Sequence, residues 1–259
     1  MKYIYAFILV LTLMAASPAN GQKFLEKPYR EWSKEEAFKV TADSPWAVEY
    51  QSERGLDDQA RLQQRREQAD TRLSGSDRGN QGRPSVPIPV VMRLHSALPV
   101  RQAIVRLQQI GAGYDKMKRE EQEKFDASTA KFLECAICRD YYVVTLGKWR
   151  DTSTVGISDG IFQTFKYEDL KGKVSLVNDR DERLEIVSFT PPKNSTDSAI
   201  FFFKRPVAEA PFFLRSDKEI RFLFSNDLRD NTSAYSKLIP RVFEFKISKI
   251  LSADGKIQF

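Results

Sequence analysis

Apolar and polar residues alternate over short segments in the C-terminal half of the chain, and this two-residue period predicts β-strands. The clearest example is segment 242–250, in which apolar side chains occupy every second position at Phe243, Phe245 and Ile247. Turn-forming Asn, Asp, Pro and Gly residues separate such segments. We expect strands at 86–94, 141–146, 172–177, 184–189, 199–204, 220–225, 242–250 and 256–259.

The spacing of these strands indicates how they are assembled. Several short strands separated by turns are typical of an antiparallel sandwich or of a strongly bent sheet, and we expect residues 140–259 to form a mainly antiparallel, sandwich-like part. Segment 86–94 is expected to be an edge strand, because Pro87 and Pro89 have no N–H to donate to a neighbouring strand.

A period of 3.6 residues predicts helices in the first half of the chain. Ser33 is a suitable N-cap for a short helix, which ends before Pro45. Two further helices are expected over about residues 97–133, the first capped by Ser96 and the second highly charged. These elements predict an α+β fold with a short N-terminal helix and two helices packed on the β part. The apolar stripe of the first of the two is Leu98, Ile104, Leu107 and Ile110.

The N-terminus has the pattern of a secretory signal peptide, which we assign to residues 1–21. A basic residue precedes an apolar run from Tyr3 to Ala16, and small residues follow at Ala19 and Gly21. A membrane-spanning helix needs about 20 apolar residues, and this run is shorter. We therefore expect a mature chain without a transmembrane segment, exported to the periplasm or the exterior.

Three segments follow the signal peptide. Residues 22–50 hold the short N-terminal helix, and residues 86–259 form the α+β domain. Residues 51–85 contain no aromatic residue, valine or isoleucine and are rich in arginine and glutamine, so we expect a disordered linker. Acidic residues nearly cancel the linker arginines, and no aromatic side chain is available for base stacking, so nucleic-acid binding is not expected.

The composition excludes several kinds of catalytic site. The 259 residues include one histidine and carry a net charge of +6. A single histidine cannot form a histidine-rich metal site, and no Gly-x-Ser-x-Gly motif accompanies it. We expect His95 to be a surface or loop residue and the acidic segment 178–182 to be a polar turn. No catalytic residue, metal site or cofactor is predicted.

The cysteine motif Cys135-Ala136-Ile137-Cys138 has three interpretations. A zinc site would need further ligands that the chain hardly offers. A redox dithiol is typically placed at the N-terminus of a helix, whereas this pair follows the charged helix. In an exported protein a local disulfide is the common outcome, so we favour a Cys135–Cys138 bridge that braces the helix-to-strand junction.

Phenylalanines are concentrated between residues 201 and 224, and alternation cannot bury three consecutive ones on the same face of a strand. At least one side chain of the 201–203 run must therefore point to the other side. Burial of the cluster is favoured, and exposure would make it a surface for a partner. The candidate binding patch consists of Phe201, Phe202, Phe203, Phe212 and Phe213.

Three sequence blocks resemble a group of uncharacterised exported bacterial proteins. They are KPYREWSKEEA followed by DSPWA, over residues 27–47, and SALPVRQA at 96–103, with a weaker likeness at 141–144. The resemblance implies a bacterial origin and export. It implies no activity and no catalytic residue.

The sequence favours a non-enzymatic exported protein that binds a protein or cell-envelope partner, or has a structural role, through its β-rich domain. The absence of a complete catalytic set in the sequence motivates this hypothesis. Two alternatives stay open: a thiol–disulfide redox protein that uses Cys135 and Cys138, and a hydrolase that uses carboxylates. The ligand and the oligomeric state are not predicted.

Overall fold

The segments with alternating apolar residues form antiparallel strands. The computed structural model describes residues 23–50, 90–148, 162–194, 197–206, 212–214, 216–230 and 240–246; the predicted signal peptide, linker and final strand lie outside them. The described residues form eight strands: β1 (Ala47–Tyr50), β2 (Val90–Leu94), β3 (Tyr141–Lys148), β4 (Val174–Val177), β5 (Arg183–Thr190), β6 (Ala199–Lys204), β7 (Glu219–Phe224) and β8 (Val242–Lys246).

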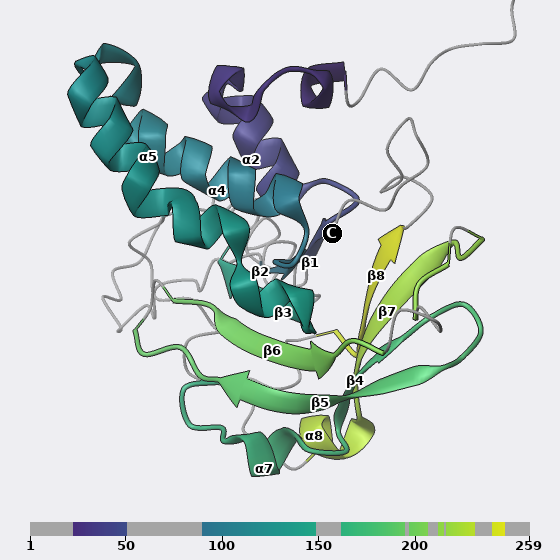
Figure 1. Cartoon of the computed structure of the whole chain (residues 1–259). Helices are drawn as coiled ribbons and strands as arrows, with labels where there is room; N and C mark the ends of the chain where they lie inside the picture. Colours follow the sequence, from purple (N-terminus) through teal and green to yellow (C-terminus); the bar gives the residue numbers. More distant parts are fainter. Residues whose placement is uncertain are drawn as a thin grey trace, which may run out of the picture.

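These strands form a single sheet in the order β1-β2-β3-β6-β5-β4-β7-β8. The sheet curls until its two ends approach each other, with the rings of Tyr50 on β1 and Phe243 on β8 6.3 Å apart (Figure 1). The fold is α+β as predicted, but its β part is a near-barrel and not a sandwich. A bulge between Ile186 and Ser188 bends β5, which pairs with β6 on one side and β4 on the other, so the ladder continues without splitting into two sheets.

The prediction of an edge strand at 86–94 was wrong. The strand β2 begins at Val90, after both prolines, and it pairs with β1 and with β3. The prolines therefore remove no hydrogen bond from this ladder. The strand at this edge is β1, a four-residue strand that the sequence pattern did not indicate.

Three longer helices gather beside β1, β2 and β3: α2 (Lys34–Ala42), α4 (Leu98–Gly111) and α5 (Arg119–Glu134) (Figure 1). Ser33 begins α2 as predicted, because its hydroxyl accepts the Glu36 N–H while the Glu36 carboxylate accepts the Ser33 N–H. Ser96 does not cap α4. The shorter elements are η1 (Lys23–Glu26), η2 (Tyr29–Glu31), η3 (Tyr114–Lys116), η4 (Ala136–Arg139), α7 (Tyr167–Leu170) and α8 (Asn226–Asp230).

Aromatic rings fill the interior of the near-barrel. Phe201 has no exposed surface and packs against Phe222 and Phe189, with ring centroids 5.1 and 5.2 Å away. Apolar residues of the helices, such as Val40 and Val100, belong to the same buried cluster. The helices and the curled sheet therefore share a core.

Polar bonds attach the N-terminal segment to the other helices, and the one from Arg106 to Trp32 is buried. The Arg106 guanidinium on α4 donates from Nε to the Trp32 carbonyl at 2.8 Å and from both terminal nitrogens to the Asp115 carboxylate at 3.0 Å. Arg30 donates to Asp126 on α5 at 2.8 Å. These bonds fix the helical side of the molecule, which carries one wall of the site described next.

Candidate functional site

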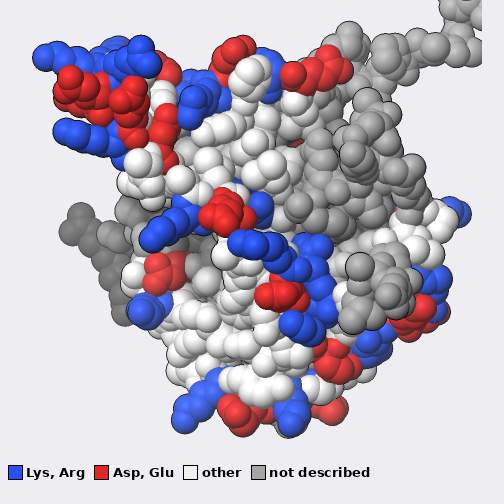
Figure 2. Space-filling model, viewed as in Figure 1, with Lys and Arg blue, Asp and Glu red and all other residues white. Residues whose placement is uncertain are grey.

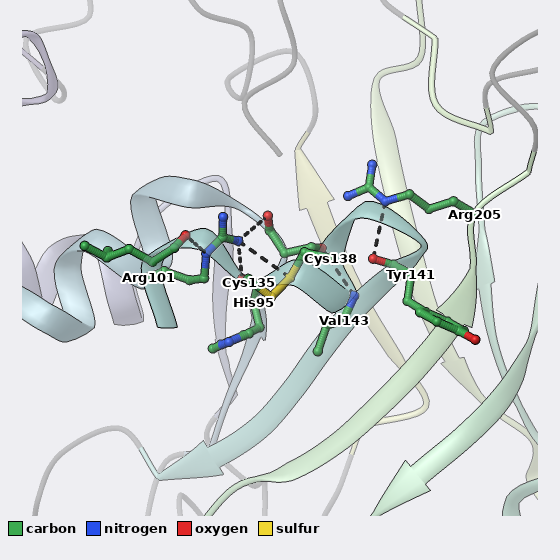
Figure 3. Close-up of a disulfide and its surroundings, with 9 residues drawn as sticks. His95, Arg101, Cys135, Cys138, Tyr141, Val143 and Arg205 are labelled. Carbon is green, nitrogen blue, oxygen red and sulfur yellow. Dashed lines mark hydrogen bonds between the residues drawn. A yellow bond between two sulfur atoms is a disulfide. The ribbon is translucent and has the colours of Figure 1, made fainter. Parts of the chain in front are cut away.

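The predicted disulfide between Cys135 and Cys138 lies where α5 gives way to β3 (Figure 3). Cys135 ends α5 in the left-handed conformation with φ of 48°, a geometry that glycine usually supplies at this position. The short helix η4 then leads into β3 at Tyr141. The bridge thus braces a helix-to-strand junction, as the sequence indicated.

Arg101 on α4 reaches into this junction and joins four chain segments. Its Nε donates to the Leu133 carbonyl near the end of α5 at 3.0 Å. One terminal nitrogen donates to the carbonyls of His95 and Ser96, at 3.0 and 2.5 Å, and lies 3.8 Å from Cys138 Sγ (Figure 3). Among the described residues none of the partners of this guanidinium is a carboxylate.

Burial of positive charge without carboxylate partners disfavours the charged form of Arg101. Desolvation lowers the pKa of Arg101, and the nearby charge of Arg205 lowers it further. Arg205 itself follows β6, lies 4.2 Å from the centre of the Tyr142 ring and donates to the Tyr141 carbonyl at 3.3 Å. The junction is therefore a positively charged environment around a disulfide.

His95 occupies the turn before α4, in a loop as predicted, and is half-buried there. Burial, together with the charges of Arg101 and Arg93, lowers the pKa of His95 to about 4. Its ring packs edge-on against Phe132 with centroids 5.2 Å apart. The half-buried imidazole packs against α5, and at neutral pH it is in its uncharged form. The adjacent Ser96 hydroxyl accepts the Val143 N–H, which explains why it does not cap α4.

The structure separates the five phenylalanines of the candidate binding patch. Phe201, Phe203, Phe212 and Phe213 are all buried and belong to the core cluster. Phe202 lies opposite Val143 on the outer side of the strand and is half-buried. The alternation argument therefore holds within β6, and four of the five side chains are core residues.

Phe202 belongs to a partly exposed surface that we name the β5–β6 outer face. The Tyr141 ring packs edge-on against Phe202 at 6.3 Å, and Lys204 Nζ lies 4.8 Å from the centre of the Tyr141 ring. Figure 2 shows mostly uncharged side chains over β5 and β6, with basic and acidic side chains intermixed near the end of β6. The residues of this face are Tyr141, Val187, Ile200, Phe202 and Lys204.

The acidic segment 178–182 forms a polar turn between β4 and β5, as predicted. Asn178 is fully buried and its amide donates to the Phe212 carbonyl at 2.8 Å. The Arg180 guanidinium binds both oxygens of the buried Asp217 carboxylate, at 2.7 and 2.8 Å. These carboxylates are thus used to hold loops together. In the described part of the chain, no group of three or more His, Cys, Asp or Glu residues could hold a metal ion.

Sequence reasoning did not single out Arg101 or Arg205. A weak signal was available for Arg101, since it lies three residues after Leu98 and three before Ile104, within the predicted apolar stripe of the helix. An arginine in that position is usually interpreted as a solvent-exposed residue that interrupts the apolar stripe. Only the fold brings it to the cysteines, which are more than 30 positions away in the sequence.

Comparison of the chain with protein-family models, with curated proteins and with solved structures gives no match. Within the described residues, no helix is both long and apolar enough to cross a bilayer. The disulfide junction and the β5–β6 outer face are therefore the features of this chain that bear on its function.

Proposed function

We propose that this chain is an exported, non-enzymatic binding protein that contacts a protein partner through the β5–β6 outer face. The observation that carries the proposal is the outward position of Phe202, which packs on Tyr141 and is half-buried, while its neighbours Phe201 and Phe203 are buried. Partly exposed aromatic side chains on a rigid strand are typical anchors of protein interfaces.

Further exposed apolar surface surrounds this anchor. Val187 on the β5 bulge is 42% exposed, and Ile200 lies half-buried two positions before Phe202 on the same side of β6. Contiguous apolar area on a strand surface favours contact with another macromolecule. Strands on both sides hydrogen-bond to β6, so the backbone is held in place and a partner can bind this surface without a rearrangement of the sheet.

The charge at the rim indicates the chemistry of the partner. The exposed Lys204 at the end of β6 places its ammonium over the Tyr141 ring. A partner that combines an apolar side chain with a neighbouring carboxylate would satisfy both the aromatic surface and the cation. We therefore assign the occupant as a protein with an acidic, partly apolar contact surface.

Site-specific photocrosslinking in cells that produce the full chain tests this assignment. A crosslinking amino acid replaces Phe202, and the matched control replaces Lys124, an exposed residue of α5. We expect an adduct with a second protein from position 202 and none from position 124. Lys204→Glu should reduce the yield of the adduct about five- to tenfold, because it reverses the charge at the rim.

Three outcomes would overturn the proposal. They are no adduct from position 202, equal adducts from both positions, or an adduct between two copies of this chain alone. Export is tested separately by mass spectrometry, because a precursor that keeps residues 1–21 and a shorter mature chain differ in mass. A chain that keeps residues 1–21 and stays in the cytosol would contradict export.

A further inference from the structure

We propose that Cys135 and Cys138 undergo thiol–disulfide exchange with an external dithiol, in which Arg101 stabilises Cys138 as the leaving thiolate. The proposal goes beyond the binding function and does not depend on the β5–β6 outer face. It rests on the guanidinium nitrogen of Arg101 that lies 3.8 Å from Cys138 Sγ.

The two sulfurs differ in access. Cys138 is 7% exposed and lies against α4, whereas Cys135 is half-buried at the end of α5. An attacking thiolate therefore meets Cys135 first, and the sulfur that leaves is the one beside the guanidinium. A leaving thiol with a lower pKa departs faster, so the position of Arg101 favours this direction of attack.

The exchange conserves atoms and electrons. One thiolate of the dithiol forms a bond to Cys135 Sγ, the Cys135–Cys138 bond breaks, and its electron pair leaves with Cys138 Sγ. The second thiolate of the dithiol then bonds to the sulfur of the first and releases Cys135. Two electrons pass from the dithiol to the cysteine pair, the dithiol becomes a disulfide, and its two protons go to the cysteines or to water.

Reduction of the disulfide would supply Arg101 with an anionic partner. In the described residues, the oxidised form offers its buried charge three carbonyls and a disulfide sulfur but no anion. A buried cation without a counter-ion is costly, and a thiolate at Cys138 would provide one at contact distance. The guanidinium thus favours the charged form of the thiol over the neutral form.

Other charged and titratable groups near Cys138 come from α5, η4, the turn before α4 and the end of β6. Arg139 is exposed, and its ion pair with Glu134 at 3.0 Å balances both charges. The remaining groups are Asp140 next along the chain, His95 in the turn before α4, and Arg205 after β6, whose backbone N–H donates to the Asp140 carbonyl. Asp140 opposes a thiolate, whereas Arg101 and Arg205 favour it.

The experiment measures the thiol pKa of Cys138 in the full chain carrying Cys135→Ser, in which Cys138 is the only thiol. Thiolate absorbance is followed against pH, and alkylation by iodoacetamide is timed at pH 7. We expect a pKa clearly below the ordinary thiol value of about 8.5. Arg101→Gln should slow alkylation at pH 7 about tenfold, since it removes the adjacent charge.

Two further variants separate electrostatics from folding. Arg139→Gln, which removes an exposed cation already paired with Glu134, should change the alkylation rate less than twofold. Arg101→Lys retains the charge and should recover part of the loss. In the oxidised chain with both cysteines, reduction by dithiothreitol should slow with Arg101→Gln and not with Arg139→Gln.

A Cys138 pKa at or above the ordinary value would overturn the proposal on the Cys135→Ser chain alone, even if Arg101→Gln fails to fold. Equal effects of Arg101→Gln and Arg139→Gln would also overturn it. A mixed disulfide trapped on Cys138 in place of Cys135 would refute the assigned direction of attack.

Discussion

The partly buried imidazole of His95 makes the stability of this protein depend on pH between about 4 and 6.5. It is the only histidine in the sequence, and burial lowers its pKa to about 4. The unfolded chain, in which the pKa is about 6.5, therefore binds more protons than the folded chain between these two values. The contribution of His95 to stability is therefore complete above this pH window and is lost as the pH falls through it.

We predict that lowering the pH from 7 to 5 removes about 2 kcal/mol of the free energy of unfolding through His95. Urea unfolding at both pH values measures the loss, and His95→Gln should remove most of the difference. The NMR titration of the His95 ring gives the pKa directly. An identical pH dependence in His95→Gln, or a ring that titrates near its ordinary value, would contradict the partly buried, neutral imidazole.

At the scale of the element, α4 shows how polar side chains can occupy a buried helix face. Its buried residues include Arg101 and Arg106, whereas Leu98 of the predicted stripe is 39% exposed. Each guanidinium is accepted because backbone carbonyls of other segments receive its N–H groups. The apolar stripe correctly predicted where the helix lies in the sequence, but it did not predict which face of α4 is buried.

The strand β3 requires a glycine at position 147, because there is no space for a side chain there. Gly147 lies opposite Val91 of β2. A Cβ atom at this position would collide with the Ser198 hydroxyl oxygen and lie 3.2 Å from Ser198 Cβ. We predict that Gly147→Ala destabilises the protein by about 1–3 kcal/mol, measured by urea unfolding. Adding Ser198→Gly should restore much of this loss.

The matched control for this prediction is Gly111→Ala at the end of α4, where no atom lies within 4 Å of the added Cβ. This change should be neutral or stabilising by up to about 1 kcal/mol, because alanine favours a helix over glycine. Additive effects of Gly147→Ala and Ser198→Gly would show that the two sites do not touch.

At the scale of the whole molecule, the helical segment before β1 and the near-barrel are one packing unit. Val40 of α2 and the phenylalanines of the sheet belong to the same buried cluster, and β1 pairs with β2 across a long stretch of sequence. A disruption in either part therefore exposes apolar surface of the other.

We predict that the N-terminal helix and the sheet unfold in one transition. Trp32 and Trp46, both 2% exposed, report on the N-terminal segment, and Trp149→Phe removes the third tryptophan, outside the described residues. Tryptophan fluorescence and far-ultraviolet circular dichroism should then give coincident urea curves. Loss of the fluorescence signal at a clearly lower urea concentration would show that the segment unfolds separately.

The sequence by itself determined those features that depend on neighbours within a few residues. Ser33 and Glu36 specify the start of α2, a short apolar and aromatic run specifies β6 over residues 199–204, and the two cysteines lie close enough in sequence to form a local disulfide. In each case the interacting groups lie within one turn of helix or along one strand, so a local pattern is sufficient.

The tertiary structure alone decided the closure of the sheet and the surroundings of the disulfide. Closure depends on the β5 bulge and on the approach of β1 to β8, which lie nearly 200 positions apart in sequence. Arg101 reaches Cys138 and the Leu133 carbonyl only after α4, α5 and β3 have packed. Long-range packing sets these contacts because the hydrogen-bond partners of a buried cation come from segments that no local pattern connects.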